Sequence, residues 1–255
     1  MPWAVMDKQR LEYTALHWDL SQCEPQADHV PLWCDDGLTR DAMNGVLRVA
    51  EMPFHPPYPA IQSRQDIQLL RGFAAAVPPG GVIAESGSYL GGSAKIMLEA
   101  ADPSVTLHAF DFSWHDNTRW DYHYDRAELQ WITHSWGWAL PPSVITRLDF
   151  ASWYLSAHDN VHLRYANVPY DLVDWDQPCD LIFEDSSHEN PQLHDIVTFW
   201  LPWLRPGGTL AGHDYHNAEW PDVRQEAAAV AAKLGVKLNY TDESNIWWVV
   251  KPEER

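Results

Sequence analysis

The chain has 255 residues, with 17 Lys and Arg against 36 Asp and Glu, which gives a formal net charge of −19 at pH 7. A chain of this length can bury a substantial core, and we expect one large α/β domain with a small extension. So negative a protein repels a phosphate backbone, which excludes nucleic acid as an expected partner.

The three cysteines, Cys23, Cys34 and Cys179, are far apart and form no C-x-x-C pair, so they do not predict a disulfide framework. Cys23, His29 and Cys34 lack a fourth ligand and the usual zinc spacing, which disfavours a zinc site. The initial "MPWAVMDKQRLEY" does not resemble a signal peptide, and no apolar run approaches the ~20 residues that span a bilayer. We therefore expect a cytoplasmic protein with no membrane partner.

Residues 1–62 show weak periodicity and include the proline-rich "MPFHPPYPAI", which predicts an N-terminal cap segment of short helices and extended chain. The main domain is expected over 63–255. Its first stretch, "SRQDIQLLRGFAAAVPPGG", places apolar side chains on one helical face and ends in Pro and Gly. The side chains on that face are Ile67, Leu70, Phe73, Ala74 and Val77.

Strand and helix patterns alternate along the rest of the chain. The strand "GVIAE" leads into "SGSYLGGSAKIMLEAA", a glycine-rich turn that opens a helix. The strands "VTLHAFD", "VHLRYA" and "CDLIFED" follow, then a helix over 190–204, the strand "GGTLAGHD" and an alanine-rich helix from about Pro221 to Leu234. "VKLNY" and "NIWWVVK" are closing strands. The pattern predicts a mainly parallel seven-stranded sheet with helices on both faces, because parallel strands need crossover connections.

The interval from about 113 to 160 is longer than one helix and two turns require, so we predict a lid-like insertion there. Several of the 15 tryptophans fall between Trp114 and Trp138, among polar residues. Such rings are suited to stacking on a sugar or an aromatic substrate, although packing in the core also explains tryptophans in general.

Four acidic residues end predicted strands: Glu85, Asp111, Asp185 and Asp214. Ligands of open α/β sheets bind beyond these carboxyl ends, so we expect the acids on one rim. The turn "ESGSYLGGS" brings backbone close to a ligand at a helix start, but it departs from the dinucleotide pattern G-x-G-x-x-G. Asp111, 24 residues after Gly87, is placed to accept the hydroxyls of a ribose.

"DLIFED" and "TLAGHD" are predicted to be adjacent strands about 4.8 Å apart, which brings Asp185 and Asp214 together. Two such carboxylates repel unless a cation or a proton lies between them. We predict a divalent cation, Mg²⁺ first and Mn²⁺ or Ca²⁺ as alternatives, bound by Asp185, Asp214 and His213. His188 and Asp185 are predicted as the catalytic residues, with His188 as the general base. The competing interpretations are structural: helix capping by Asp185, a surface or capping role for His188, a ring of His213 bonded to backbone, and a turn position for Asp214.

The motifs "AESGSYLGGSA", "HAFD" and "CDLIFEDSSHENPQLHDIVTFWLPWLRPGGTLAGHDYH" resemble those of class I S-adenosylmethionine-dependent methyltransferases, over about residues 63–251. They are similar in particular to the metal-dependent sugar and natural-product O-methyltransferases with a D-x-x-H … P-G-G … H-D-Y signature. His213 stands where some relatives carry a metal-binding acid. The resemblance implies a Rossmann-like fold and S-adenosylmethionine as methyl donor.

The resemblance also implies a set of donor-binding residues, with the glycine turn at the methionine end, Asp111 at the ribose and the segment around Asn167 at the adenine. The set is Glu85, Gly87, Ser88, Tyr89, Gly91, Ser93, Asp111, Phe112, Asn167 and Asp185.

The expected activity is methylation of a hydroxyl on a small polar acceptor, a glycoside or another natural product. A metal-free methyltransferase with His188 or His213 as base, and a non-catalytic carbohydrate- or small-molecule-binding protein, are the alternatives. An NAD-linked dehydrogenase is disfavoured by the glycine spacing. The acidic surface and the N-terminal segment are compatible with a homo-oligomer.

Overall fold

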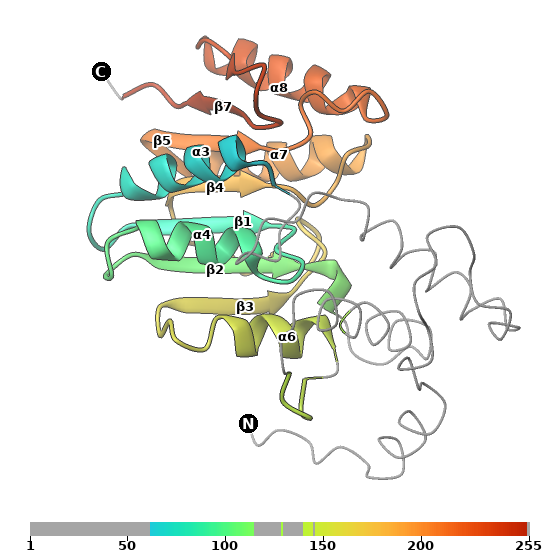
Figure 1. The fold of residues 1–255 in the computed structure, drawn as a ribbon. Helices are drawn as coiled ribbons and strands as arrows, with labels where there is room; N and C mark the ends of the chain where they lie inside the picture. Colours follow the sequence, from blue (N-terminus) through green and yellow to red (C-terminus); the bar gives the residue numbers. More distant parts are fainter. Residues whose placement is uncertain (1–61, 115–128, 130–139, 145, 254–255) are drawn as a thin grey trace, which may run out of the picture.

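A seven-stranded sheet forms the centre of the computed structural model, which describes residues 62–114, 129, 140–144 and 146–253 (Figure 1). Its strands lie in the order β3-β2-β1-β4-β5-β7-β6. The first five are parallel, whereas β7 runs antiparallel to both β5 and β6. The bounds are Val82–Ser86 (β1), Thr106–Asp111 (β2), Val161–Tyr165 (β3), Cys179–Glu184 (β4), Leu204–Gly212 (β5), Asn239–Tyr240 (β6) and Trp247–Val250 (β7).

Helices cover both faces of this sheet, with α3 and α4 in front and α7 behind in the view of Figure 1. The α-helices are α3 (Arg64–Ala75), α4 (Gly92–Ala100), α6 (Arg147–Tyr154), α7 (Gln192–Trp203) and α8 (Pro221–Leu234), and a short 3₁₀ helix, η2, spans Phe112–Trp114. The predicted Rossmann-like α/β fold is confirmed. The strand order reverses between β1 and β4, and such a switch point is where open α/β sheets bind ligands.

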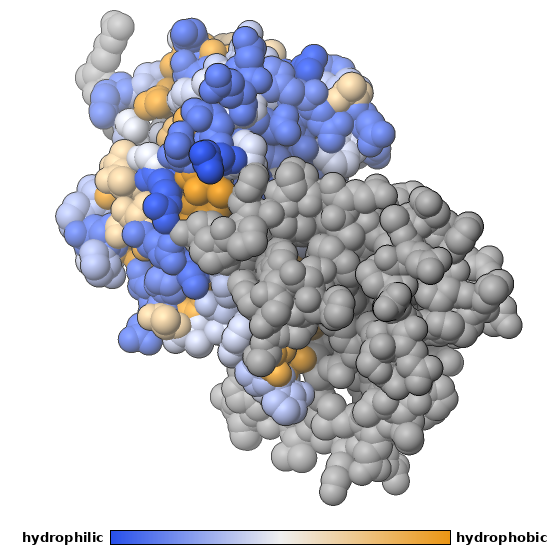
Figure 2. Space-filling model, in the orientation of Figure 1, coloured by the Kyte–Doolittle hydropathy of each residue, from blue (hydrophilic) through white to orange (hydrophobic). Residues whose placement is uncertain are grey.

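The described part of the surface in Figure 2 is mostly hydrophilic, with small hydrophobic areas between. Within the described residues, no helix is both long and apolar enough to cross a membrane.

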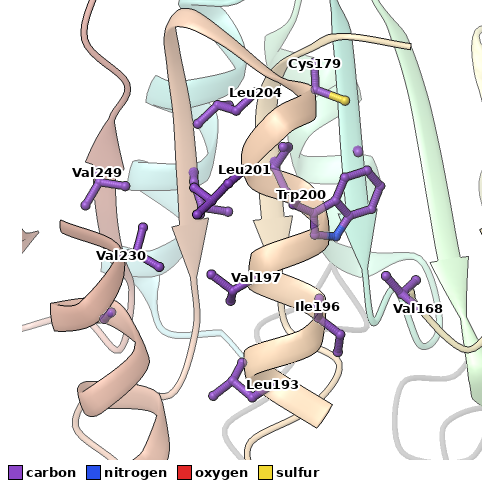
Figure 3. Packing of buried hydrophobic residues seen from close by; sticks show 14 of the residues in the cluster. Val168, Cys179, Leu193, Ile196, Val197, Trp200, Leu201, Leu204, Val230 and Val249 are labelled. Carbon is purple, nitrogen blue, oxygen red and sulfur yellow. The ribbon is translucent and has the colours of Figure 1, made fainter. Parts of the chain in front are cut away.

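Two layers of buried side chains hold the helices to the sheet. The layer shown in Figure 3 joins α7 and α8 to the strands, and α7 supplies apolar side chains at helical spacing. These are Leu193, Ile196, Val197, Trp200 and Leu201. Each side chain of this size contributes roughly 1.5–3 kcal/mol when fully buried. The Trp200 indole also donates to Ser86 Oγ at 3.0 Å, which fixes α7 against the end of β1.

Three expectations concern segments that lie wholly or partly outside the described residues. The cap segment 1–62, with the residues considered for zinc, is outside except for Gln62. Most of the predicted insertion at 113–160 is also outside, including its tryptophans after Trp114 and before Trp153. Trp114 itself is buried in the core and donates through Nε1 to the Tyr89 carbonyl at 2.5 Å, so it packs inside the protein.

Candidate active site

The carboxyl-terminal tips of the four central strands are joined by main-chain hydrogen bonds. The arrowheads of these strands point to the same edge in Figure 1. The bonds beyond the strand ladder are Gly87 N–H to Phe110 O at 2.8 Å, Asp185 N–H to Ser86 O at 2.8 Å, and His213 N–H to Glu184 O at 3.1 Å. The turns after β1, β4 and β5 are therefore fixed relative to one another before any side chain is considered.

A cavity of about 560 Å³ lies at this edge. This volume is in the range that binds small molecules and cofactors. Seven of the ten predicted donor-binding residues line it, namely Gly87, Ser88, Tyr89, Ser93, Asp111, Phe112 and Asp185. His188, His213 and Asp214 line the same cavity, so the structure brings the predicted donor site and the predicted cation site together.

Three predicted donor-binding residues do not line the cavity. Glu85 is fully buried in β1 beneath it. Gly91 is the N-cap of α4, and a side chain there would face Leu155. Asn167 follows β3 and binds within the protein, accepting from Gln192 Nε2 at 2.9 Å. A role for these three in donor binding stays a prediction.

The glycine turn needs an unusual backbone. Gly87 has φ +87°, and a Cβ there would overlap the main-chain carbonyl group of Asp185, so only glycine fits. Tyr89 also has a positive φ of 52°, and its N–H donates to Asp111 Oδ2 at 2.5 Å. The other oxygen of Asp111 accepts from the Ser113 N–H at 2.6 Å. These bonds fix the carboxylate at the cavity wall.

Glu85 is a buried acid next to this turn. Burial raises its pKa to about 7, against the opposing effect of the nearby Ser88 and Ser93 hydroxyls. Among the described residues, neither carboxylate oxygen receives a well-formed hydrogen bond. The negative charges of Asp111 and Asp185 raise the pKa further. Burying an acid without hydrogen-bond partners costs free energy, so packing alone does not explain a glutamate at this position.

Asp185 and Asp214, hereafter the carboxylate pair, meet His188 at the wall of the cavity. One possible ligand atom from each of the three lies within 4.8 Å of the others. His188 Nε2 is 2.9 Å from Asp214 Oδ2 and 3.9 Å from Asp185 Oδ1. This nitrogen is buried and makes no hydrogen bond of good geometry with any residue that the structure describes, despite the short distance to Asp214. The ring stacks on Trp220, with centroids 3.9 Å apart, which fixes its plane.

His213 lies behind the carboxylate pair. Its Nδ1 is 3.2 Å from Asp214 Oδ2 and 3.7 Å from Asp185 Oδ1, and its Nε2 is 3.5 Å from Asp66 Oδ2. Burial disfavours the charged ring, but the negative charge of Asp185 and the contacts with Asp214 and Asp66 outweigh it, so the pKa of His213 is raised well above its usual value.

The same charges act on His188 and Asp214. Burial opposes protonation of His188, but contacts with the carboxylate pair raise its pKa to about 9. Burial alone would raise the pKa of Asp214, whereas its contacts with His188 and His213 hold that pKa well below its usual value. The cluster is therefore a network of strongly interacting charges, as is common at functional sites.

The residues present fit a divalent cation. Donors about 2.1 Å from Mg²⁺ in octahedral geometry lie about 3 Å from their neighbours. The distances within the cluster, 2.9, 3.2, 3.7 and 3.9 Å, are near that spacing. His213, the predicted third ligand, and His188, the predicted base, both face the carboxylate pair. Mixed oxygen and nitrogen donors also suit Mn²⁺ or a later metal.

Several residues at the cavity wall were not predicted from the sequence. Gln62, Asp66, Trp220 and Asn245 all line it. The side-chain oxygen of Gln62 is buried and has no hydrogen-bond partner within the described part of the chain. For Asp66 the sequence holds one signal, its place three residues after Ser63 at a helix start, and that signal indicates capping alone.

The sheet order, the glycine turn after β1 and the acid at the end of β2 define a class I methyltransferase fold, whose members use S-adenosylmethionine. A family model described as "Methyltransferase domain" matches residues 84–215, just over half of the chain, and the chain belongs to this family. The protein is thus an S-adenosylmethionine-dependent methyltransferase. No curated protein matches it significantly in sequence.

Solved structures share the fold at low sequence identity. A protein of Corynebacterium glutamicum is 14% identical with a TM-score of 0.53, over 96% of this chain and 99% of that one. A candidate caffeoyl-CoA O-methyltransferase of Staphylococcus aureus is 14% identical with a TM-score of 0.50, over 95% and 99%. The O-methyltransferase TomG of Streptomyces achromogenes, involved in tomaymycin synthesis and solved with S-adenosylmethionine, is 14% identical with a TM-score of 0.48, over 86% and 91%.

Proposed function

We propose that this protein transfers a methyl group from S-adenosylmethionine to a hydroxyl of a small polar acceptor, a glycoside or another natural product, with the help of a divalent cation. One observation carries the proposal. The glycine turn and Asp111 line the same cavity as the carboxylate pair and His188. A donor bound at the first group would therefore lie next to the second.

The acceptor is proposed to enter past His188. A second, polar hollow of about 360 Å³ adjoins the cavity and shares Ser186, His188 and Trp220 with it. Its other walls are the polar loop and the first residues leading into α7, from Ser187 to Gln192. Polar groups beside one tryptophan ring suit an acceptor that carries several hydroxyls.

In the transfer step, the acceptor oxygen attacks the methyl carbon, the bond from that carbon to the sulfonium sulfur breaks, and S-adenosylhomocysteine leaves. The hydroxyl proton passes to Nε2 of His188 in molecules whose ring is neutral, and this fraction grows as the pH rises toward the ring's pKa of about 9. Stacking on Trp220 holds the ring in place for this transfer. A divalent cation at the carboxylate pair, when bound, supplies Lewis acidity that lowers the pKa of the acceptor hydroxyl.

This proposal predicts that donor binding and turnover can be separated by mutation. Asp185→Asn and Asp214→Asn should each lower methyl transfer by at least about 100-fold, since the cation ligands or the base partner are lost. Asp214→Asn, which lies outside the predicted donor-binding set, should bind S-adenosylhomocysteine within about threefold of the wild type, because the turn that binds the donor is unchanged. Asp111→Ala should instead weaken that binding by about tenfold or more, in line with the loss of a charged hydrogen-bond acceptor.

Titration calorimetry and a methyl-transfer assay over a panel of glycosides and phenols would measure these effects. Full activity of both Asp185→Asn and Asp214→Asn would exclude the cation site, and unchanged S-adenosylhomocysteine affinity in Asp111→Ala would exclude the ribose assignment.

A metal-free mechanism is the second candidate, because the cluster already contains two histidines facing the carboxylate pair. A positively charged imidazole can screen two acids as a cation does. Methyl transfer that persists in EDTA but is lost in His188→Ala would favour this mechanism over the metal-assisted one.

A further inference from the structure

Asp66 is a buried carboxylate at the start of α3, with only 1% of its surface exposed. Its Oδ2 accepts from the Ser63 N–H at 2.7 Å, and the Ser63 hydroxyl accepts from the Asp66 N–H at 3.1 Å, which completes a capping box. Its Oδ1 accepts from the Ser244 hydroxyl at 2.5 Å and from the Asn245 N–H at 3.0 Å. The carboxylate is thereby fixed from two parts of the chain.

The edge of this fixed carboxylate faces the His213 ring. His213 Nε2 lies 3.5 Å from Asp66 Oδ2, and both side chains are almost entirely buried. The opposite ring nitrogen, Nδ1, faces the carboxylate pair at 3.2 and 3.7 Å. The imidazole therefore bridges Asp66 and the site where we propose a cation.

We propose that Asp66 is a positioning residue of the active site, which holds the His213 ring through Nε2–H and directs Nδ1 at the carboxylate pair. A carboxylate that accepts from the outer N–H of a histidine fixes its tautomer and orientation, and this arrangement is common behind metal-binding histidines. The inference rests on the proposed function for the role of Nδ1, but the contact between Asp66 and His213 can be tested independently of it.

Helix capping alone does not account for the geometry. The chain contains a second capping box of the same form, at the start of α6, where Asp149 Oδ2 accepts from the Thr146 N–H at 3.0 Å. Beyond its own capping box, Asp66 makes three further contacts, with Ser244, Asn245 and His213, which capping does not require. Because the two capping boxes have the same form, Asp149→Asn is a control for the capping part of Asp66→Asn.

The first experiment tests whether the Nε2–H of His213 is hydrogen-bonded to Asp66. In a ¹H–¹⁵N spectrum of cation-free protein labelled at histidine, the ring Nε2–H of His213 should give a slowly exchanging signal, because it is buried and bonded. His213→Gln assigns the signal by its loss. The signal should also be lost or exchange rapidly in Asp66→Asn, and it should persist in Asp149→Asn. A signal that persists in Asp66→Asn, or is absent from the wild type, would overturn the proposal.

The second experiment measures how the contact between Asp66 and His213 affects cation affinity. Asp66→Asn should weaken Mn²⁺ binding about 10- to 100-fold, measured by electron paramagnetic resonance, while S-adenosylhomocysteine affinity changes less than about twofold. Asp149→Asn should leave both affinities unchanged. Wild-type Mn²⁺ affinity in Asp66→Asn would overturn a positioning role. A wild-type protein that binds no Mn²⁺ would instead refute the cation of the proposed function, and the spectrum would still decide the Asp66 contact.

Discussion

At the scale of single residues, Glu85 is a buried acid whose ionisation lowers the stability of the fold. Its carboxylate is buried, and burial raises its pKa from 4.5 to about 7. In the unfolded chain it would titrate near the ordinary value. Between those two pH values the folded state binds more protons than the unfolded state, so stability falls as the pH rises through this window.

This sign gives a testable prediction for Glu85→Gln, a neutral residue of nearly the same shape. At pH 8 the variant should have a higher free energy of unfolding than the wild type, by about 3 kcal/mol at most, because a buried charge is removed. Near pH 4.5 the difference should largely vanish, since wild-type Glu85 is then protonated in the folded state. Urea denaturation at both pH values measures this, and a gain of equal size at both would contradict it.

At the scale of whole elements, Gly87 determines how closely the end of β1 can pack against the turn after β4. With φ +87° and the Asp185 carbonyl group where a Cβ would lie, alanine forces the two strand tips apart. We expect Gly87→Ala to lose about 2 kcal/mol or more of stability and to abolish S-adenosylhomocysteine binding.

Gly72 provides the matched control, since it is exposed within α3 and a Cβ there would meet nothing within 4 Å. Gly72→Ala should gain about 0.5–1 kcal/mol, because alanine loses less entropy in a helix. Thermal melting and calorimetry on the two variants measure both effects. Equal stability changes in the two would refute the steric account of the turn.

The helices and strands could be predicted from the sequence because each follows from the pattern of apolar and polar residues within its own segment. β1 and β4 are apolar runs with buried centres, as parallel strands between two helix layers must be. The alanine-rich helix was predicted from about Pro221 to Leu234, and α8 has those bounds. β5 begins earlier than expected, at Leu204, and its pairing with β4 changes register between Cys179 and Leu181.

The sequence predicted those site residues that lie at the carboxyl ends of parallel strands. Acids that end parallel strands share one edge, so the convergence of Asp111, Asp185 and Asp214 follows from strand positions. Glu85 was assigned to the same rim, but β1 continues to Ser86 and Glu85 stays beneath the cavity. The contact between Asp66 and His213 joins residues 147 positions apart, so no pattern within a single segment of the sequence predicts it.

At the scale of the whole molecule, net charge should influence both stability and ligand binding. A formal charge of −19 repels itself more strongly in the compact folded state than in the unfolded chain, and it attracts cations. Salt screens both effects, because the Debye length falls from about 14 Å at ~0.05 M to about 4 Å at ~0.5 M.

We therefore expect opposite responses to sodium chloride raised from ~0.05 to ~0.5 M. The melting temperature of the cation-free protein should rise, by about 2–4 °C for each kcal/mol of relieved repulsion. The affinities for Mn²⁺ and for S-adenosylmethionine, whose sulfonium is positive, should fall over the same range. S-adenosylhomocysteine lacks the sulfonium charge and is the control, so its affinity should change least. A melting temperature that falls with salt, or equal salt dependence for the two adenosyl ligands, would show that net charge does not govern these properties.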